Sequence, residues 1–262
     1  MKKKFNQCYD ISQKNVDYLN ISIKRSLGKL PHMEVAKAYS HIINKIKNKK
    51  KDITILDVGC LSGHFNYTFT KKLKNKFTYT GIDPWKLHID AANKIWKKEK
   101  SVNFQVGWAQ KIPYEKDNFD FVICSNVLTH IPEITRPLKE MLRVTKKYLI
   151  LRTPIHDKSY RIQMVLNSKW FKYTNIKPEN EFDKKGNPRV YEYYDVHSKD
   201  YLYSVIKNLH RKAKVKFIKD TFFTKKGINN KKEKKLNKTK IINGMQVSDL
   251  LILPHHFVII EK

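Results

Sequence analysis

The stretch Ile55-Leu-Asp-Val-Gly-Cys-Leu-Ser-Gly-His-Phe65 decides the fold of this chain. Its first half belongs to a short apolar run, beginning at Ile53, that is typical of a buried strand. Gly59 and Gly63 then predict a tight turn, and a helix is expected over residues 64–75. Because a helix N-terminus presents free N–H groups, this order predicts a ligand where the strand ends.

Alternating strands and helices extend the pattern on both sides of that stretch. Such spacing is typical of right-handed βαβ units, so we predict an α/β fold with a doubly wound, mostly parallel sheet. Strands are expected at 53–58, 77–82, 102–106, 119–124, 148–151, 214–223 and 250–260, and helices at 35–46, 64–75, 86–99, 135–144 and 199–211. Leu87, Ala91 and Ile95 are expected to face the core from the third of these helices.

The chain of 262 residues divides unevenly in this interpretation. Residues 1–50 form an N-terminal helical lead-in, and residues 51–262 form one domain. Within that domain, residues 155–200 interrupt the alternation as an aromatic and charged insertion, and the Lys- and Asn-rich residues 225–240 are predicted to be a flexible loop.

The net charge of +30 leaves two interpretations open. A basic chain can bind nucleic acid or an anionic membrane surface. However, only seven of the 54 basic residues are arginine, the residue best suited to reading phosphates and bases. Compositional drift towards lysine is therefore favoured over a nucleic-acid footprint.

Three separated cysteines, Cys8, Cys60 and Cys124, form neither a CxxC metal site nor a disulfide framework. We expect no metal, and Cys60 and Cys124 are expected to be inert apolar residues. No apolar segment follows the basic N-terminus, and no window has the length of a membrane helix. A cytoplasmic protein without stable membrane insertion is therefore expected.

Two acids give the predicted ligand site its chemistry. Asp57 stands directly before the turn, and Asp83 ends the second strand, where an acid can bind both ribose hydroxyls of a nucleoside. The dinucleotide fingerprint would need glycines where Leu61 and His64 stand, so a pyrophosphate cradle is poorly provided. Asp57 would also repel phosphate and suit a cationic group.

Four segments in order resemble class I S-adenosylmethionine-dependent methyltransferases, in the small-molecule, type 11-like subgroup. The segments are LDVGCLSGHF, YTGIDPW, WAQKIPYEKDNFDFVICSNVLTHI and LKEMLRVTKKYLIL, which together cover roughly residues 50–155. The resemblance implies a Rossmann-like, seven-stranded sheet with an antiparallel last strand, and S-adenosyl-L-methionine as cofactor.

Carried over residue by residue, the resemblance gives each motif a cofactor contact. The turn would face the methionine part, Asp57 its amino group, and Asp83 the ribose. Leu61 replaces the family's middle glycine, and Trp108 replaces an acid common at the adenine edge, which implies recognition of adenine by backbone groups and stacking. The expected cofactor-binding residues are Asp57, Gly59, Cys60, Leu61, Gly63, Asp83, Pro84, Trp85, Trp108, Ala109, Ser125 and Asn126.

The insertion at 155–200 is predicted to be a lid that supplies the acceptor site. Tyr160, Tyr191 and Tyr193 are candidate substrate contacts, and His156, ahead of His197, is the candidate general base. The leading hypothesis is transfer of a methyl group to an O or N atom of a small molecule or saccharide. Two alternatives stay open: an RNA (tRNA or rRNA) methyltransferase, and a non-catalytic cofactor-binding regulator or partner subunit. The oligomeric state is not predicted.

Overall fold

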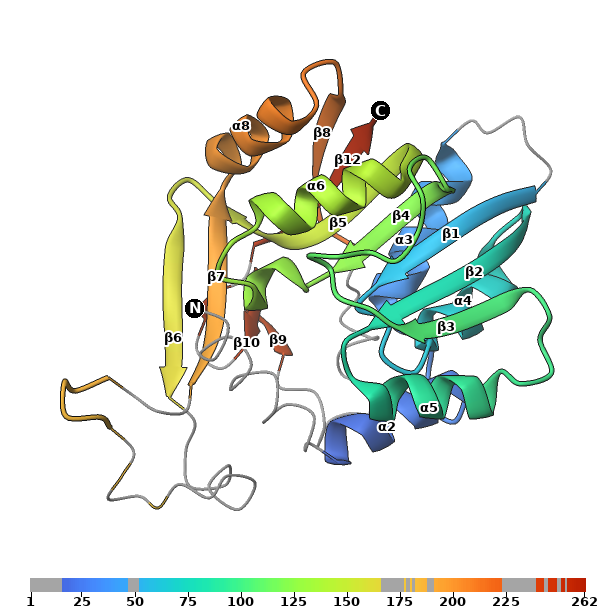
Figure 1. The fold of residues 1–262 in the computed structure, drawn as a ribbon, viewed down its shortest axis with the longest axis horizontal. Coiled ribbons are helices and arrows are strands. Elements are labelled where there is room, and N and C mark those ends of the chain that lie inside the picture. Colours follow the sequence, from blue (N-terminus) through green and yellow to red (C-terminus); the bar gives the residue numbers. More distant parts are fainter. Residues whose placement is uncertain are drawn as a thin grey trace.

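A computed structural model describes residues 16–46, 52–165, 177, 180, 182–187, 191–222, 239–242, 245–248, 251–252 and 254–262. Its centre is a nine-stranded sheet in which seven strands follow the order β3-β2-β1-β4-β5-β12-β8 (Figure 1). These strands are β1 (Asp52–Val58), β2 (Lys76–Asp83), β3 (Val102–Val106), β4 (Phe119–Ser125), β5 (Thr145–His156), β8 (Lys214–Lys219) and β12 (His255–Glu261).

The direction of the strands confirms the predicted architecture. β1 pairs in parallel with β2 and β4, and the parallel pairing continues to β3 on one side and β5 on the other. β12 runs antiparallel to both β5 and β8, so the last strand is the antiparallel one. The strand order therefore reverses between β1 and β4, which is where open α/β sheets bind ligands.

Helices cover the two faces of the sheet as separate layers. One core layer lies under α3 (Glu34–Lys45), α4 (His64–Lys72) and α5 (Lys86–Ile95), and the other lies under α6 (Thr135–Val144) and α8 (Lys199–Leu209). Tyr39 of α3 reaches across its layer, where its O–H donates to the Cys124 carbonyl oxygen at 3.0 Å. Within the part of the chain that the structure describes, no helix has the length and apolar character needed to cross a membrane.

Several predicted boundaries are wrong in detail. α5 ends at Ile95 and turns a different side inward: Leu87 is exposed, whereas His88, Ile89 and Ala92 are buried. The reason is that α5 packs against α2 as well as the sheet, so polar His88 is covered by another helix. Strand β8 ends at Lys219 rather than at residue 223, and β12 begins only at His255.

Some elements were not predicted at all. The lead-in contains a first helix, α2 (Val16–Ser26), before α3. The insertion supplies two antiparallel strands, β6 (Tyr160–Val165) and β7 (Tyr191–Ser198), which stand beside the end of β5 (Figure 1). A small separate sheet contains β9 (Thr239–Ile242), β10 (Met245–Ser248) and β11 (Leu251–Ile252). Most of the predicted flexible loop, residues 225–238, lies outside the described residues.

Candidate cofactor site

The turn between β1 and α4 has the backbone shape that its glycines predict. Gly59 and Gly63 have φ angles of 83° and 73°, and Leu61 between them also lies in the left-handed region, at 52°. A Cβ atom on Gly59 would lie 2.4 Å from Cγ2 of Val127, so this position has no room for a side chain. Leu61 therefore occupies a backbone conformation that favours glycine.

Each backbone N–H from residue 59 to residue 63 donates a hydrogen bond inside the protein. Because none of these donors is left over, the turn offers no cradle for a pyrophosphate, in agreement with the missing dinucleotide fingerprint. The acceptors are the Ile82 carbonyl for Gly59 and Cys60 (2.8 and 3.1 Å), Asp83 Oδ2 for Leu61 (2.9 Å), Ser22 Oγ for Ser62 (3.2 Å) and the Cys60 carbonyl for Gly63 (2.9 Å).

Helix α2 holds the turn through two buried serines, Ser22 and Ser26, which bond to the buried Ser62 of the turn. The Ser26 hydroxyl donates to the Ser62 carbonyl at 2.9 Å, and the hydroxyls of Ser22 and Ser26 both lie within hydrogen-bonding distance of the Ser62 hydroxyl. Trp96, after α5, donates its indole N–H to the same carbonyl at 3.2 Å. The sequence interpretation missed this contact, because serines on a polar helix give no signal of a distant partner.

Two buried carboxyl groups stand at the ends of β1 and β2. Asp83 accepts N–H groups from Leu61 and Trp85 with its two oxygens, at 2.9 and 3.0 Å, and it thereby ties the two turns together. Burial raises its pKa to about 6 in spite of these bonds. Asp57 accepts the phenol O–H of Tyr79, and burial, with the nearby charge of Asp83, raises the pKa of Asp57 to about 7. A positive ligand would stabilise both ionised carboxylates.

The residues predicted to form the adenine edge lie on the two loops that meet at Asp83. Pro84 and Trp85 are half-buried after β2, and Trp108 is half-buried next to the buried Ala109. The N–H of Gly107 donates to the Asp83 carbonyl at 3.1 Å, which brings the loop after β3 to the end of β2. The indole nitrogen of Trp85 is buried without a hydrogen-bond partner, so it is available as a donor to a ligand.

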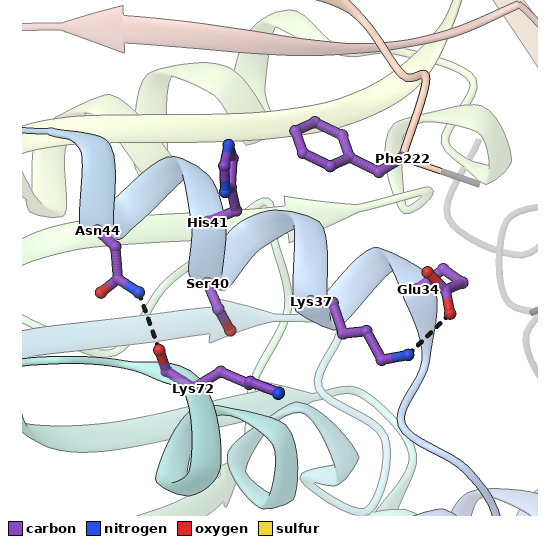
Figure 2. A pocket seen from close by; sticks show the side chains of 7 residues that line it. All are labelled: Glu34, Lys37, Ser40, His41, Asn44, Lys72 and Phe222. Atoms are coloured by element: carbon purple, nitrogen blue, oxygen red, sulfur yellow. Dashed lines mark hydrogen bonds and ion pairs between the residues drawn. The ribbon is translucent and has the colours of Figure 1, made fainter. Parts of the chain in front are cut away.

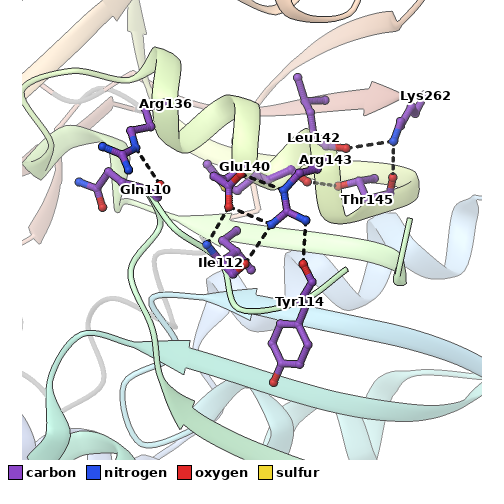
Figure 3. Close-up of polar contacts among 10 residues, drawn as sticks. Gln110, Ile112, Tyr114, Arg136, Glu140, Leu142, Arg143, Thr145 and Lys262 are labelled. Carbon is purple, nitrogen blue, oxygen red and sulfur yellow. Dashed lines mark hydrogen bonds and ion pairs between the residues drawn. The ribbon is translucent and has the colours of Figure 1, made fainter. Parts of the chain in front are cut away.

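Helix α6 clamps the same loop from the other side (Figure 3). Arg143 donates to the carbonyl oxygens of Tyr114 and Ile112 at 2.7 and 2.9 Å. Glu140 accepts the Ile112 N–H at 2.9 Å and is paired with Arg143. The hydrogen bond from Arg143 lowers the pKa of Glu140, so the clamp is charged over the physiological range. The loop that follows Trp108 is therefore held at a fixed distance from the sheet.

At the end of β4, Ser125 and Asn126 are half-buried, and Asn126 has a left-handed φ of 58°. Arg152 of β5 donates to the Asn126 side-chain oxygen at 2.9 Å and, through Nε, to Asp220 at 2.7 Å. Both partners of this ion pair are buried, with 2% and 0% of their side chains exposed. The sequence interpretation missed Arg152 and Asp220. The one available signal was an arginine directly after the apolar residues 149–151.

The histidines of the insertion have different surroundings. His197 of β7 is buried with its Nε2 atom unpartnered, and its neighbour in the sheet is Ile155 of β5. Burial lowers the pKa of His197, and Asp195 and a hydrogen bond with the Leu128 backbone partly offset this effect. His156, in contrast, is exposed and stacks edge-on against Tyr160.

The aromatic residues of the insertion are only partly described. Tyr160 is 46% exposed. Tyr191 and Tyr193 belong to β7, but their side chains lie outside the described part. β7 contacts the short helix η1 (Leu128–His130) that follows β4, so this hairpin lies at the carboxyl edge of the sheet.

The two central cysteines, Cys60 and Cys124, are buried, and burial raises the pKa of both thiols, as expected for apolar residues.

Comparisons with known proteins point to one family. Residues 49–238, more than half of the chain, match the family model described as a methyltransferase domain. An uncharacterized methyltransferase, YcgJ of Bacillus subtilis (strain 168), is 26% identical over 95 residues, which cover 36% of each chain. Demethylmenaquinone methyltransferase of Staphylococcus aureus (strain MRSA252) is 28% identical over 130 residues, 49% of this chain and 54% of that protein. The chain thus spans from about a third to about half of these curated relatives.

Solved structures share the fold. A SAM-dependent methyltransferase from Methanosarcina mazei superposes with a TM-score of 0.52 at 19% identity, covering 84% of this chain and 96% of that one. The [4+2]-cyclase SpnF reaches 0.51 at 14% identity, with 86% and 80% covered. At such identities the likeness concerns the fold alone, and a fold of this kind carries more than one chemistry.

Proposed function

This chain belongs to the methyltransferase domain family, and on that premise we propose that it is an S-adenosylmethionine-dependent methyltransferase acting on an O or N atom of a small molecule or saccharide. The assignment of the cofactor rests on the turn at residues 59–63. Every backbone N–H of this turn already donates a hydrogen bond, and the turn lies next to the buried carboxyl of Asp83. Such a turn can lie against a nucleoside and its amino-acid chain but offers no free N–H group of its own to a pyrophosphate.

The residues present fit this cofactor. Each oxygen of Asp83 has accepted one N–H and can accept one more bond, which suits the two ribose hydroxyls. Trp85 and Trp108 would flank the adenine, and Ser125 and Asn126 would line the pocket towards the transferred group. Asp57 and Asp83 give the site a negative potential that suits a ligand with an ammonium and a sulfonium group.

When bound, S-adenosylmethionine supplies an electrophilic methyl group on a sulfur that leaves as a neutral thioether. The protein then has to align the acceptor and remove a proton from it. His197 suits that second task better than His156, because its buried ring is neutral near pH 7 and its Nε2 has a free lone pair. In this proposal His197 takes the proton as the acceptor atom gains the methyl group.

The position of the β6–β7 hairpin supports an acceptor site at the carboxyl edge of the sheet. β7 contacts η1, which begins two residues after Asn126, and pairs with the end of β5. The insertion would therefore cover the mouth of the pocket as a lid, with Tyr160, Tyr191 and Tyr193 as substrate contacts.

A product assay tests the proposal. The full chain is incubated with S-adenosylmethionine and a panel of saccharides and small hydroxy or amino compounds, and S-adenosylhomocysteine is measured. With the acceptor found, His197→Ala should lower kcat by about 100-fold or more, with an unchanged KM for the cofactor. His156→Ala is the matched control and should stay near wild type. The reverse ranking of the two variants would refute the role of His197.

Two alternatives have observations of their own. A net charge of +30 would attract an RNA acceptor whatever its origin, so tRNA and rRNA fragments belong in the same panel. The [4+2]-cyclase with this fold keeps open a cofactor-binding protein that transfers no methyl group. Cofactor binding without product from any acceptor would favour that alternative.

A further inference from the structure

An open groove of about 420 Å³ crosses the outer side of α3, on the opposite side of that helix from the sheet (Figure 2). Glu34, Lys37, His41 and Asn44 line it from α3, at the spacing that puts residues on one side of a helix. Lys72 closes the groove from the end of α4, and Phe222 closes it from the segment after β8. None of these residues takes part in the cofactor site.

The groove has a positive charge. Lys37 and Lys72 line it, and Glu34 is the one acid among its lining residues. Glu34 is paired with Lys37 at 2.8 Å, with 16% of its side chain exposed against 40% for Lys37. Next to the groove, the pKa of His32 is lowered by burial and then by the charges of Lys37, Lys72 and Lys71. An anion that enters the groove therefore meets Lys37 and Lys72, against one acid.

The same groove has an aromatic wall. The rings of His41 and Phe222 lie 5.2 Å apart at 63°. Phe222 is held from behind by Phe257, edge-on at 5.9 Å, and its N–H donates to Asp220 at 3.2 Å. His41 is exposed and Phe222 is half-buried, so both rings present a surface to a ligand, and the ring of Phe222 is held by Phe257.

The rim between α3 and α4 is rigid. The Asn44 side chain donates to the Lys72 carbonyl at 2.8 Å and accepts the Lys74 N–H at 3.0 Å, which fixes the end of α4 against α3. Lys72 therefore extends from a fixed backbone.

We propose that this groove binds single-stranded nucleic acid, with phosphates at Lys37 and Lys72 and a base against Phe222 and His41. Lysines that follow the backbone, combined with aromatic rings that stack on bases, are how proteins bind single strands without sequence preference. A bilayer is a poorer fit, because Phe222 is recessed in the groove, and membrane binding requires apolar side chains that protrude. The proposal does not depend on which molecule accepts the methyl group.

The test measures fluorescence anisotropy of labelled oligouridylate and oligothymidylate of about 12 nucleotides, without cofactor, over a range of salt concentrations. Lys37→Gln/Lys72→Gln should lower the slope of log K against log salt by about 1.4, because each phosphate contact on a single strand contributes about 0.7. Lys94→Gln/Lys97→Gln removes the same charge from exposed lysines in and after α5 and should change the slope much less. The two oligonucleotides distinguish RNA from DNA as the natural strand.

Two further variants separate stacking and local charge from net charge. Phe222→Leu keeps the apolar contact with Phe257 but removes the aromatic face, and it should weaken binding about fivefold or more. Glu34→Gln removes the one acid of the groove and should tighten binding. Thermal unfolding of each variant establishes that it is folded.

Equal losses in the groove pair and the control pair would overturn the proposal, because binding would then follow net charge alone. It would also be overturned if the oligonucleotides did not bind, or if the groove variants lost affinity only for phosphatidylserine vesicles. Weaker binding of Glu34→Gln would contradict the assigned charge of the groove.

Discussion

The glycine turn and the far end of β5 lie on the same edge of the sheet, but different kinds of contact hold them. Around the turn, the donors are backbone N–H groups, which donate mainly to the end of β2 at Ile82 and Asp83 and to Ser22 of α2. At β5, Arg152 joins Asn126 and Asp220, which are 26 and 68 residues away. The turn is thus held through its backbone, whereas the β5 end is held by buried charged side chains; in our proposal the first faces the cofactor and the second the acceptor.

The largest effect is expected at the β5 end, when the buried ion pair is removed. Arg152→Met leaves the fully buried carboxylate of Asp220 without its partner, and the loss of one member of a buried pair costs about 3–5 kcal/mol. Urea unfolding measures the change. The double variant Arg152→Met/Asp220→Asn should recover part of the lost stability, and an additive loss would show that the two residues are not coupled.

The next effect concerns the turn. Asp83→Ala removes the acceptor for the Leu61 and Trp85 N–H groups and the proposed ribose contact. Since hydrogen bonds to a charged group contribute about 1.5–3 kcal/mol each, the affinity for S-adenosylmethionine should fall by about 100-fold or more. Calorimetric titration measures this, with circular dichroism as the control for folding. Undiminished affinity would exclude Asp83 from the cofactor site.

A smaller, pH-dependent effect is expected at Asp57. Its pKa of about 7 means that the free protein gains this negative charge as the pH rises through neutrality. Asp57→Asn should therefore bind S-adenosylmethionine about tenfold more weakly than wild type near pH 8, and about equally near pH 5.5, where the wild-type carboxyl is protonated.

The same shift has a consequence for stability. A pKa raised above its unfolded value means that the folded state holds a proton that the unfolded state has lost, so stability falls as pH rises from about 4 to about 7. Asp57→Asn should accordingly unfold at a higher temperature than wild type near pH 8 without cofactor. Lower stability of the variant at that pH would contradict the shift.

The smallest effect concerns the backbone conformation of the turn itself. Leu61 has a left-handed φ of 52°, so Leu61→Gly should raise the free energy of unfolding by about 1 kcal/mol. Gly63→Ala has the opposite sign, because its Cβ would lie 2.3 Å from the Phe104 ring. Thermal unfolding of the two variants measures both, and a less stable Leu61→Gly would show that the leucine side chain contributes more than the backbone strain costs.

The same difference explains what the sequence could predict. The apolar run into Gly59 and the acid that ends the next strand, Asp83, follow a recognisable order along the chain, so the turn, the position of Asp83 at the end of β2 and the parallel strands were predicted correctly. Arg152 and Asp220 gave no such pattern, because a buried ion pair between residues 68 positions apart is recognised only once the sheet is assembled. The buried side of α5 was wrong for a related reason, since it is set by the packing of α2, a helix whose polar sequence does not reveal its partner.

Isothermal titration of the full chain with S-adenosylmethionine, and with NAD as the matched dinucleotide, tests the central claim most directly. The turn has no N–H left for a pyrophosphate and has two buried acids for a cation, so we predict one site for S-adenosylmethionine and no heat with NAD. Binding of NAD, with no binding of S-adenosylmethionine, would contradict the account.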